Sequence, residues 1–185
     1  MEQVRESKRF FAARLMKYFL LALFLSFLGW AFEVVLAVNY TGEWINPGAM
    51  RLPLCPIYGV ALLGMYRIAG TPDSKRGLLK KQEGRLGTAL YFIMAFVLPT
   101  LAELIVAACF DLFYGIRLWD YSHLPFNFHG YISLIVSFSW AVLIFFFMKY
   151  LFEPIKKRIW QIPYEWSMAL SLLFAVLLVA DLLLR

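Results

Sequence analysis

The chain has 185 residues, of which 62% are hydrophobic and 18% aromatic, and its formal net charge is +6. Soluble domains are about half apolar, so this composition indicates a polytopic membrane protein and excludes a soluble catalytic domain within these residues. Because a spanning helix takes roughly 20 residues, the length allows one membrane domain with short loops.

The positive charge has a different meaning in a membrane protein than in a soluble one. A soluble chain of this charge would suggest a nucleic-acid partner. Here the positions of Lys and Arg relative to the spans set the orientation of the chain. We therefore expect the lipid bilayer as the surroundings and no nucleic acid as a partner.

Residues 1–16 mix basic and aromatic side chains in the pattern of a short amphipathic helix. Arg9 and Arg14 stand beside Phe10 and Phe11, which suits a helix lying on a membrane surface. The apolar run that follows is too long for the core of a signal peptide, and no small-residue cleavage site follows it. We expect residues 1–16 to form a cytoplasmic N-terminal anchor.

Residues 17–185 are predicted to form a single transmembrane domain, an all-α bundle of five membrane helices. The apolar windows and their flanks place the spans at residues 17–38, 53–70, 87–110, 128–149 and 164–184. No internal repeat is visible, and an odd number of spans disfavours two inverted halves within one chain. Such symmetry would have to come from a homo-oligomer.

The second predicted span, residues 53–70, is the weakest of the five. Pro53 and Pro56 open it, and Gly59 and Gly64 interrupt it. Prolines are tolerated at the start of a helix. The alternative is a re-entrant segment, which would reverse the direction of every later span.

The distribution of basic residues favours five spans. With five, 15 of the 18 Lys and Arg residues fall on one side, and only Arg51, Arg117 and Arg185 fall on the other. Because basic loops stay in the cytoplasm, the N-terminus is predicted to be cytoplasmic and the C-terminus outside. A four-span arrangement would place the last basic cluster outside, which the same rule disfavours.

Two glutamates, Glu33 and Glu103, lie inside otherwise apolar spans, where a charge costs at least about 2.5 kcal/mol. Counted from Lys17 and from Gly87, each is 17th in its span, so both are expected roughly 24 Å from the cytoplasmic end. Ionisable residues at such positions usually serve proton exchange, cation binding or catalysis. The alternative is a structural ion pair, with Arg51 as the partner.

Small and polar residues align on three of the predicted spans, where they allow helices to pack closely. Spacings of three and four residues put each set on one helix face. The sets are Ala22, Ser26, Gly29, Glu33 and Ala37; Tyr91, Ala95, Pro99 and Glu103; and Gly130, Ser133, Ser137 and Trp140. Pro99 is expected to kink its helix just below Glu103. We expect three helices to surround one site.

The predicted outer loops carry more turn formers, donors and acceptors than a simple connection between spans needs. Together with the two glutamates they supply the candidate substrate-binding residues. These are Glu33, Asn46, Arg51, Cys55, Tyr58, Glu103, Trp119, Asp120, Tyr121, Asn127 and His129. For Trp119 and Tyr121 the simpler interpretation is the aromatic belt of membrane proteins. Asp120 is expected either to pair with Arg51 or Arg117, or to bind a cationic headgroup.

No cofactor and no metal is expected. His123 and His129 stand in no HExxH or His-plus-Cys spacing, and no span holds a histidine well inside it for haem. The chain has no P-loop, GxSxG or GxGxxG motif. Cys55 and Cys109 form no CxxC pair, and they are expected either as a disulfide or as two buried thiols.

An ordered set of short motifs runs through residues 20–145. It comprises Gly29-Trp30 with Glu33, Asn46 with Gly48, Pro53-Leu54-Cys55-Pro56-Ile57-Tyr58-Gly59, Glu103, Trp119-Asp120-Tyr121-Ser122, and Asn127 with Gly130. In this order and spacing the chain resembles the bacterial family called putative ABC-transporter type IV, or CmpB-like. The resemblance implies an inner-membrane ABC transporter permease, with a separate ATP-binding subunit or another membrane subunit as its partner.

Two positions depart from the pattern of this family. Its members often carry Arg between the Asn and Gly of the first loop motif, and Arg after the later Gly. This chain has Pro47 and Tyr131 at those positions. Arg51 lies close enough in the sequence to replace the first of these cations.

Three functions fit these residues. The first is a permease-like component with an outer-leaflet pocket for a transported substrate. That pocket would consist of Glu33, Glu103, Arg51 and Asp120. The second is a membrane-embedded enzyme acting on a lipid or another amphiphile, with one carboxylate as general base and Arg51 or Tyr58 orienting the reacting group. The third is a structural accessory subunit whose buried ion pair fixes helix packing.

Overall fold

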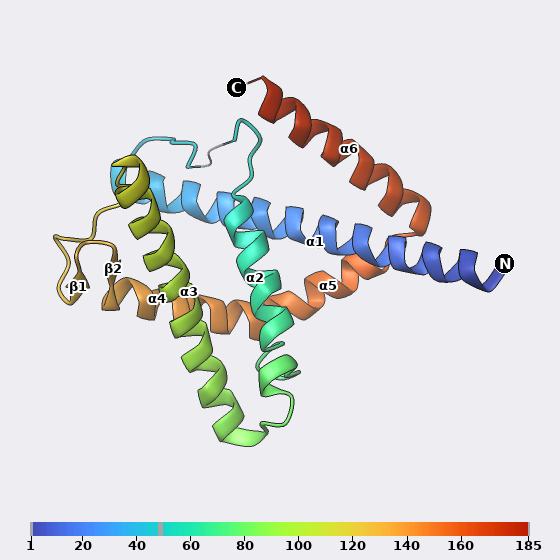
Figure 1. Ribbon diagram of the computed structural model, residues 1–185, viewed down its shortest axis with the longest axis horizontal. Helices are drawn as coiled ribbons and strands as arrows, with labels where there is room; N and C mark the ends of the chain where they lie inside the picture. Colours follow the sequence, from blue (N-terminus) through green and yellow to red (C-terminus); the bar gives the residue numbers. More distant parts are fainter. Residues whose placement is uncertain (1, 48–49, 185) are drawn as a thin grey trace. The chain divides into compact units, whose positions relative to one another are not determined.

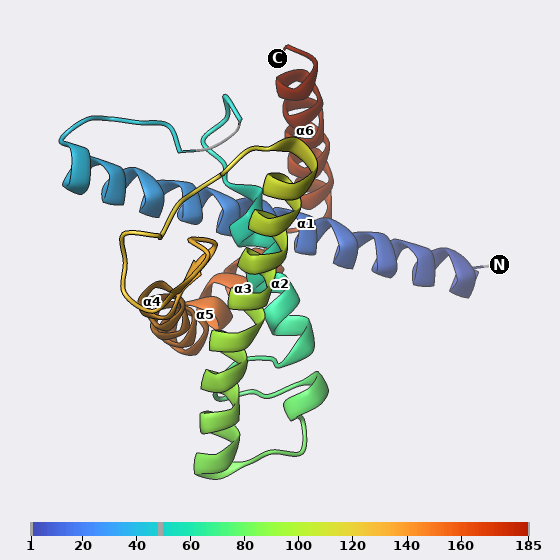
Figure 2. The same ribbon diagram turned by 60° about the vertical axis from the view of Figure 1, so that its left-hand side comes forward.

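The computed structural model describes residues 2–47 and 50–184 (Figure 1). Met1, Gly48, Ala49 and Arg185 lie outside the described residues, as do the side chains of residues 2–8. The chain divides into two compact units, Met1–Leu63 with Pro154–Arg185, and Gly64–Glu153. Both units are built from helices, as the sequence predicts (Figure 2).

Two long helices, α1 (Glu2–Thr41) and α6 (Tyr164–Leu183), form most of the first unit. Helix α1 runs without a break through Lys17, where the sequence predicts the change from a surface segment to a span. A short helix, α5 (Phe152–Trp160), leads into α6. In Figure 1, α6 begins next to the N-terminal half of α1.

Contacts near the helix starts tie α1 and α6 together. The Arg9 guanidinium lies 3.3 Å from the Glu165 carboxylate, at the first turn of α6. The Lys17 ammonium donates a hydrogen bond of 2.8 Å to the carbonyl of Trp160. The Tyr18 ring meets the Trp160 ring edge-on, with 4.9 Å between the centroids. The starts of both helices are therefore neighbours.

In the second unit, helix α3 (Gly84–Tyr114) packs against α4 (Leu134–Phe146). The buried positions of α3 recur every fourth residue, as the sequence predicts. They include Gly87, Tyr91, Ala95 and Ala107. Helix α4 contributes Ser137, from the predicted small-residue face, and Ala141, which the prediction did not include; the buried Ser133 of the predicted face precedes the helix. Small residues at these positions allow the two backbones to approach closely.

Three short elements were not predicted. A 3-10 turn, η1 (Gly77–Leu79), lies within the basic loop between α2 and α3, and a hairpin of β1 (Asn127–Phe128) and β2 (Ile132–Ser133) precedes α4. A π-helical turn, η2 (Phe147–Leu151), separates α4 from α5. Each is only a few residues long, which is too short to give a hydrophobic period.

Four helical stretches are long and apolar enough to cross a bilayer. They are Arg9–Thr41, Gly84–Tyr114, Leu134–Trp160 and Tyr164–Leu183. They overlap the first, third, fourth and fifth predicted spans, which are confirmed as helices of spanning length. The predicted start of the fourth span at residue 128 is wrong, because residues 128–133 belong to the hairpin and the helix begins at Leu134. Helix α2 (Pro56–Ile68), in the second predicted span, has 13 residues and is shorter than the roughly 20 that a spanning helix takes.

Candidate functional site

Glu33 and Tyr58 meet in the first unit. The Tyr58 hydroxyl donates a hydrogen bond to the Glu33 carboxylate, and both residues are partly buried. The Tyr58 ring lies over Gly29, where a Cβ would overlap the ring. Gly29 and Glu33 are one turn apart on α1, on the small-residue face that the sequence predicts. That face is therefore where the start of α2 packs.

Helix α2 begins part-way along α1. The backbone N–H of Cys55 donates a hydrogen bond of 3.0 Å to the carbonyl of Ser26. Gly59 lies so close to α1 that a Cβ there would overlap the carbonyl oxygen of Ala22. Ser26 is nine residues beyond Lys17, which is about 14 Å along the helix axis. Helix α2 thus starts at a level well inside the apolar part of α1.

The non-helical segment before α2 is held within the protein. Leu54 and Cys55 are buried. Non-helical backbone at membrane depth is stable only where protein covers it or where it lines a cavity. Pro56 opens α2 at a position where a backbone N–H would lack a helical partner in any case. Pro53 and Pro56 therefore suit a helix that begins beside the apolar part of α1.

Asn46 fastens the loop after α1 back onto that helix. Its side-chain oxygen accepts a hydrogen bond of 2.8 Å from the Trp30 indole N–H, and its amide donates one of 3.0 Å to the Met50 carbonyl. The Trp44 ring meets the Trp30 ring at 6.0 Å between the centroids. Gly48, the other residue of this motif, lies outside the described residues.

Arg51 meets helix α6 through its backbone. Its N–H donates a hydrogen bond of 3.0 Å to the carboxylate of Asp181, which is 6% exposed. The sequence predicts that Arg51 pairs with one of the two glutamates; among the described residues of this unit it forms no ion pair with Glu33. Sequence reasoning missed Asp181, although a single acid in an apolar final span is the same signal that selected Glu33.

In the second unit, Glu103 has a partner of the same kind as Glu33. The Tyr121 hydroxyl donates a hydrogen bond of 3.0 Å to the Glu103 carboxylate, which is partly buried on α3. Each intramembrane glutamate therefore accepts a hydrogen bond from a tyrosine of its own unit. The two glutamates belong to different units, and a pocket that unites them stays a prediction.

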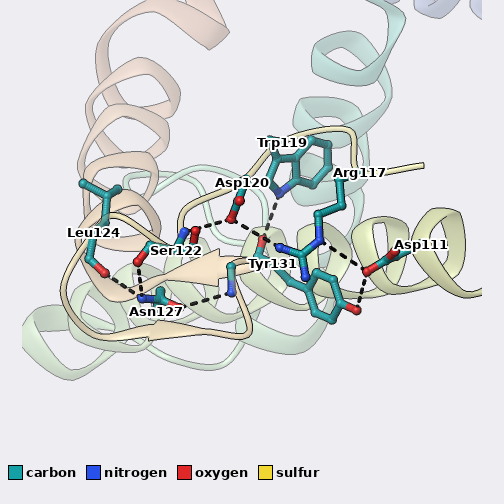
Figure 3. Close-up of polar contacts among 9 residues, drawn as sticks. Asp111, Arg117, Trp119, Asp120, Ser122, Leu124, Asn127 and Tyr131 are labelled. Atoms are coloured by element: carbon teal, nitrogen blue, oxygen red, sulfur yellow. Dashed lines mark hydrogen bonds and ion pairs between the residues drawn. The ribbon is translucent and has the colours of Figure 1, made fainter. Parts of the chain in front are cut away.

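A polar network stands at the C-terminal end of α3 (Figure 3). Asp111 accepts a hydrogen bond of 2.8 Å from the Tyr131 hydroxyl, and its carboxylate lies 3.5 Å from Arg117 Nε. Arg117 Nη1 lies 3.4 Å from the Asp120 carboxylate. Of the two expectations for Asp120, pairing with Arg117 is confirmed. Sequence reasoning did not select Asp111 or Tyr131, because Asp111 stands at a span end where acids are common.

The Trp119-Asp120-Tyr121-Ser122 motif folds the loop that carries it. The Trp119 indole N–H donates 2.8 Å to the Tyr131 carbonyl, and Asp120 accepts 2.9 Å from the Ser122 N–H. Gly130, at φ +74°, lies against Asp120, and a Cβ there would overlap the Asp120 carboxylate. The motif and the hairpin are therefore built as one piece.

Asn127 closes the same loop. Its amide donates hydrogen bonds to the carbonyls of Ser122 (3.3 Å) and Leu124 (2.7 Å), and its oxygen accepts one of 3.1 Å from the Gly130 N–H (Figure 3). All of its polar atoms are thus used in holding the loop. Asn127, which belongs to the last of the family motifs, thus has a structural role in this loop.

The loop environment changes two pKa values. The hydrogen bonds from Ser122, with Arg117 nearby, lower the pKa of Asp120 below the usual value of an aspartate. Donation to the Asp111 carboxylate raises the pKa of Tyr131 above the usual value of a tyrosine. Both shifts favour the charge state in which this network is intact at neutral pH.

The histidines and cysteines do not gather into a site. His129 is exposed, at φ +52°, with its ring 4.7 Å from the Phe128 ring. Among the residues that the structure describes, no group of three His, Cys, Asp or Glu side chains could hold a metal ion. Cys55 is buried and Cys109 is exposed, and both are free thiols, so the alternative of two buried thiols is wrong for Cys109.

A model of the family described as "Putative ABC-transporter type IV" matches residues 19–185 of this chain. The chain belongs to this family. The match confirms the resemblance seen in the motifs, and it extends beyond them through α5 and α6. No curated protein and no solved structure matches the chain.

Membership of the ABC-transporter type IV family and the apolar helices fit a membrane protein of the transporter type. The eleven candidate residues fall into two sets. Glu33, Asn46, Arg51, Cys55 and Tyr58 belong to the first unit, and Glu103, Trp119, Asp120, Tyr121, Asn127 and His129 to the second. In the first set, the Glu33 and Tyr58 side chains meet each other at the start of α2.

Proposed function

We propose that the protein is the membrane-embedded component of a transporter and that it binds its substrate beside Glu33 and Tyr58. The observation that carries this proposal is the start of α2, where a buried non-helical segment meets a glutamate and tyrosine pair on α1. Interrupted helices in transporters place helix ends and backbone groups at the substrate site. The energy for transport would come from a separate ATP-binding subunit or another membrane subunit.

The proposed topology has five crossings, with the N-terminus in the cytoplasm and the C-terminus outside. Two contacts within the first unit support it. The start of α6 lies beside the start of α1, through Arg9 and Glu165, and Asp181 near the end of α6 bonds Arg51 in the loop that follows α1. If α1 and α6 cross the membrane in the same direction, an odd number of crossings must lie between them in the chain. Helices α3 and α4 supply two crossings, so α2 must supply the third.

A helix of 13 residues can complete such a crossing if it starts below the membrane surface. It spans about 20 Å, and the hydrocarbon core is about 30 Å thick. Since α2 starts at the level of Ser26, the non-helical residues before it supply the remaining depth. The proposed location is the bacterial inner membrane, and the basic loops of the protein face the cytoplasm.

A second candidate function is a membrane-embedded enzyme that acts on a lipid or another amphiphile. A tyrosine hydroxyl on a partly buried carboxylate is also an arrangement for acid and base catalysis, and this favours Glu33 as the base. An enzyme would turn over alone in detergent. A transporter component would depend on its energy-supplying partner.

The test profiles all cellular solutes together, so that the substrate does not have to be known in advance. Cells that lack the protein are supplied with the wild type, Glu33→Gln or Glu43→Gln, and their internal and external solutes are profiled by mass spectrometry. Glu43 is an exposed glutamate in the loop after α1, so its replacement is a matched control. We expect Glu33→Gln to lower the restored solute difference at least tenfold and Glu43→Gln to leave it unchanged.

Two outcomes would contradict the proposal. One is a Glu33→Gln protein that reaches the membrane at the wild-type level and restores the full solute difference. The other is a wild-type protein that alters no solute distribution but changes the composition of lipid vesicles when purified alone, which would support the enzyme.

A further inference from the structure

A shallow groove of about 940 Å³ lies in the second unit, at the N-terminal end of α3. One wall is the first three turns of α3, another is the loop before it, and Phe145 of α4 contributes to the floor. It is therefore at the opposite end of α3 from the loop with the Trp119 motif. No residue of the Glu33 or Glu103 pairs lines it.

The groove changes from basic to apolar along the axis of α3. Arg85 stands in the first turn, Thr88 and Ala89 in the next, and Phe92 and Ile93 in the third, all on one face. These positions cover about 12 Å along the helix. Ile93 is 53% exposed. A phospholipid has the same order of chemistry, from a polar headgroup to an acyl chain.

The apolar part of the groove is bounded by packed aromatic rings. Phe92 meets Phe145 at 5.9 Å and Phe138 at 5.8 Å between ring centroids, both edge-on. Lys149 lies over the Phe145 ring, with its ammonium 6.0 Å from the centroid. The rings give a hydrophobic wall of fixed shape, which suits an acyl chain laid along it.

The loop before α3 holds Lys75, the second cation of the groove, in place. The strands of chain at Gly70 and Lys75 form a β-bridge, and Thr71 bonds Ser74 through both backbone and side chain. The Lys75 side chain then passes over Gly87, where a Cβ would lie 2.7 Å from Lys75 Cε. Gly87 thus makes room for the lysine at the groove.

The cations of the groove are not neutralised by protein. Among the described residues, neither Lys75 nor Arg85 forms an ion pair. Asp73 also lines the groove, so the lining keeps one net positive charge. The surrounding residues 67–86 hold six basic and two acidic side chains, so no excess of acid offsets this charge. An anionic group is the complement of this surface.

We infer that this groove is a binding site for one phospholipid with an anionic headgroup. Lys75 and Arg85 contact the phosphate region, and the acyl chain lies against Phe92, Ile93 and Phe145. The inference does not depend on the proposed transport function, since it concerns other residues and a different end of α3.

The test is native mass spectrometry of the full-length protein in detergent, with equal amounts of phosphatidylglycerol and phosphatidylcholine of the same acyl chains. We expect the wild type to retain phosphatidylglycerol preferentially. Each basic residue near a headgroup contributes roughly a fivefold preference, so Lys75→Gln/Arg85→Gln is expected to lower this preference about 25-fold. The matched control, Lys80→Gln/Lys81→Gln, removes the same charge from exposed positions outside the groove and is expected to stay within twofold of wild type.

A second measurement does not require the double variant to fold. A benzophenone amino acid at Ile93 is irradiated in native membranes, and we expect it to capture phospholipid. Three results would overturn the inference: equal retention of the two lipids by the wild type, an equal loss in the control pair, or capture of an ATP-binding protein at Ile93 in place of lipid.

Discussion

Glu33 and Glu103 are tolerated in apolar helices because each carboxylate accepts a hydrogen bond from a tyrosine hydroxyl within its own unit. A buried polar group without a partner would be costly, whereas a bonded one is not. Tyrosine supplies the donor without adding a charge. The result is a carboxylate whose hydrogen-bonding capacity is met inside the protein.

Removing the donor should weaken the first unit. We expect Tyr58→Phe to lower the free energy of unfolding by about 1–3 kcal/mol, because the Glu33 carboxylate loses its hydrogen bond while it remains partly buried. Thermal unfolding in detergent measures the change. Tyr40→Phe is the control, since Tyr40 is 85% exposed, and it should leave the unfolding temperature unchanged. An equal effect of both variants would argue against the role given to this bond.

The loop network should respond to acid through Asp120. Because the folded protein lowers the pKa of Asp120, its stabilising contribution is complete above the ordinary aspartate value of about 3.9 and is lost as pH falls through the lower folded value. Unfolding at pH 7 and pH 3, followed by tryptophan fluorescence, should show a smaller acid effect in Asp120→Asn than in wild type. The exposed Asp73, replaced by Asn, should keep the wild-type acid effect.

At the scale of residues, the sequence identified the unusual groups and one of two possible arginine partners for Asp120, but it did not identify the tyrosine partners of Glu33 and Glu103. Glu33 and Glu103 stood out because acids are rare in apolar runs, and Asp120 because it lies between aromatic residues. Which tyrosine or arginine pairs with each depends on how loops fold back, and that information is not in the local pattern. Asp111 and Tyr131 are 20 residues apart and meet only because the hairpin reverses the chain.

Among the elements, the contact between α1 and the start of α2 depends on glycine. A Cβ at Gly59 would meet the backbone oxygen of Ala22, which cannot move without shifting α1. We expect Gly59→Ala to destabilise the protein by about 1–3 kcal/mol, the usual cost of overpacking. Unfolding in detergent measures the difference.

Gly64 provides the control for this substitution. It lies in the same helix, and a Cβ there would meet nothing within 4 Å. Gly64→Ala should therefore be neutral or stabilising by up to about 1 kcal/mol, because alanine favours helix. If Gly64→Ala were as damaging as Gly59→Ala, close packing against Ala22 would not explain the loss at Gly59.

The long helices could be predicted because hydrophobicity over some 20 residues is a strong signal. Helix α2 was predicted too long, because its apolar residues continue through the non-helical Pro53 to Cys55 segment, and hydrophobicity alone does not separate buried loop from helix. The π-helical turn within the fourth span has no sequence signal of its own. The hairpin before α4 rests on backbone conformations at Phe126, His129 and Gly130 that are set by the loop as a whole.

For the whole molecule, the proposed topology has five membrane crossings. In a background of Cys55→Ala/Cys109→Ala, single cysteines are introduced as Glu43→Cys and Lys81→Cys, both at exposed positions. A membrane-impermeant maleimide should label Glu43→Cys in intact spheroplasts and Lys81→Cys only after the membrane is opened. Labelling of Lys81→Cys from outside would mean that α2 does not cross and that the later spans are reversed.

If this chain is the membrane component of a transporter, it should carry its partner subunits when it is purified. The tagged protein is extracted gently from its native membranes, and every protein and lipid that stays bound is identified and counted by mass spectrometry. We expect an ATP-binding subunit or a second membrane subunit in a fixed ratio to the protein. The Glu33→Gln variant should retain this subunit as well as the wild type does. A protein that purifies alone and converts an added lipid without any partner would contradict it.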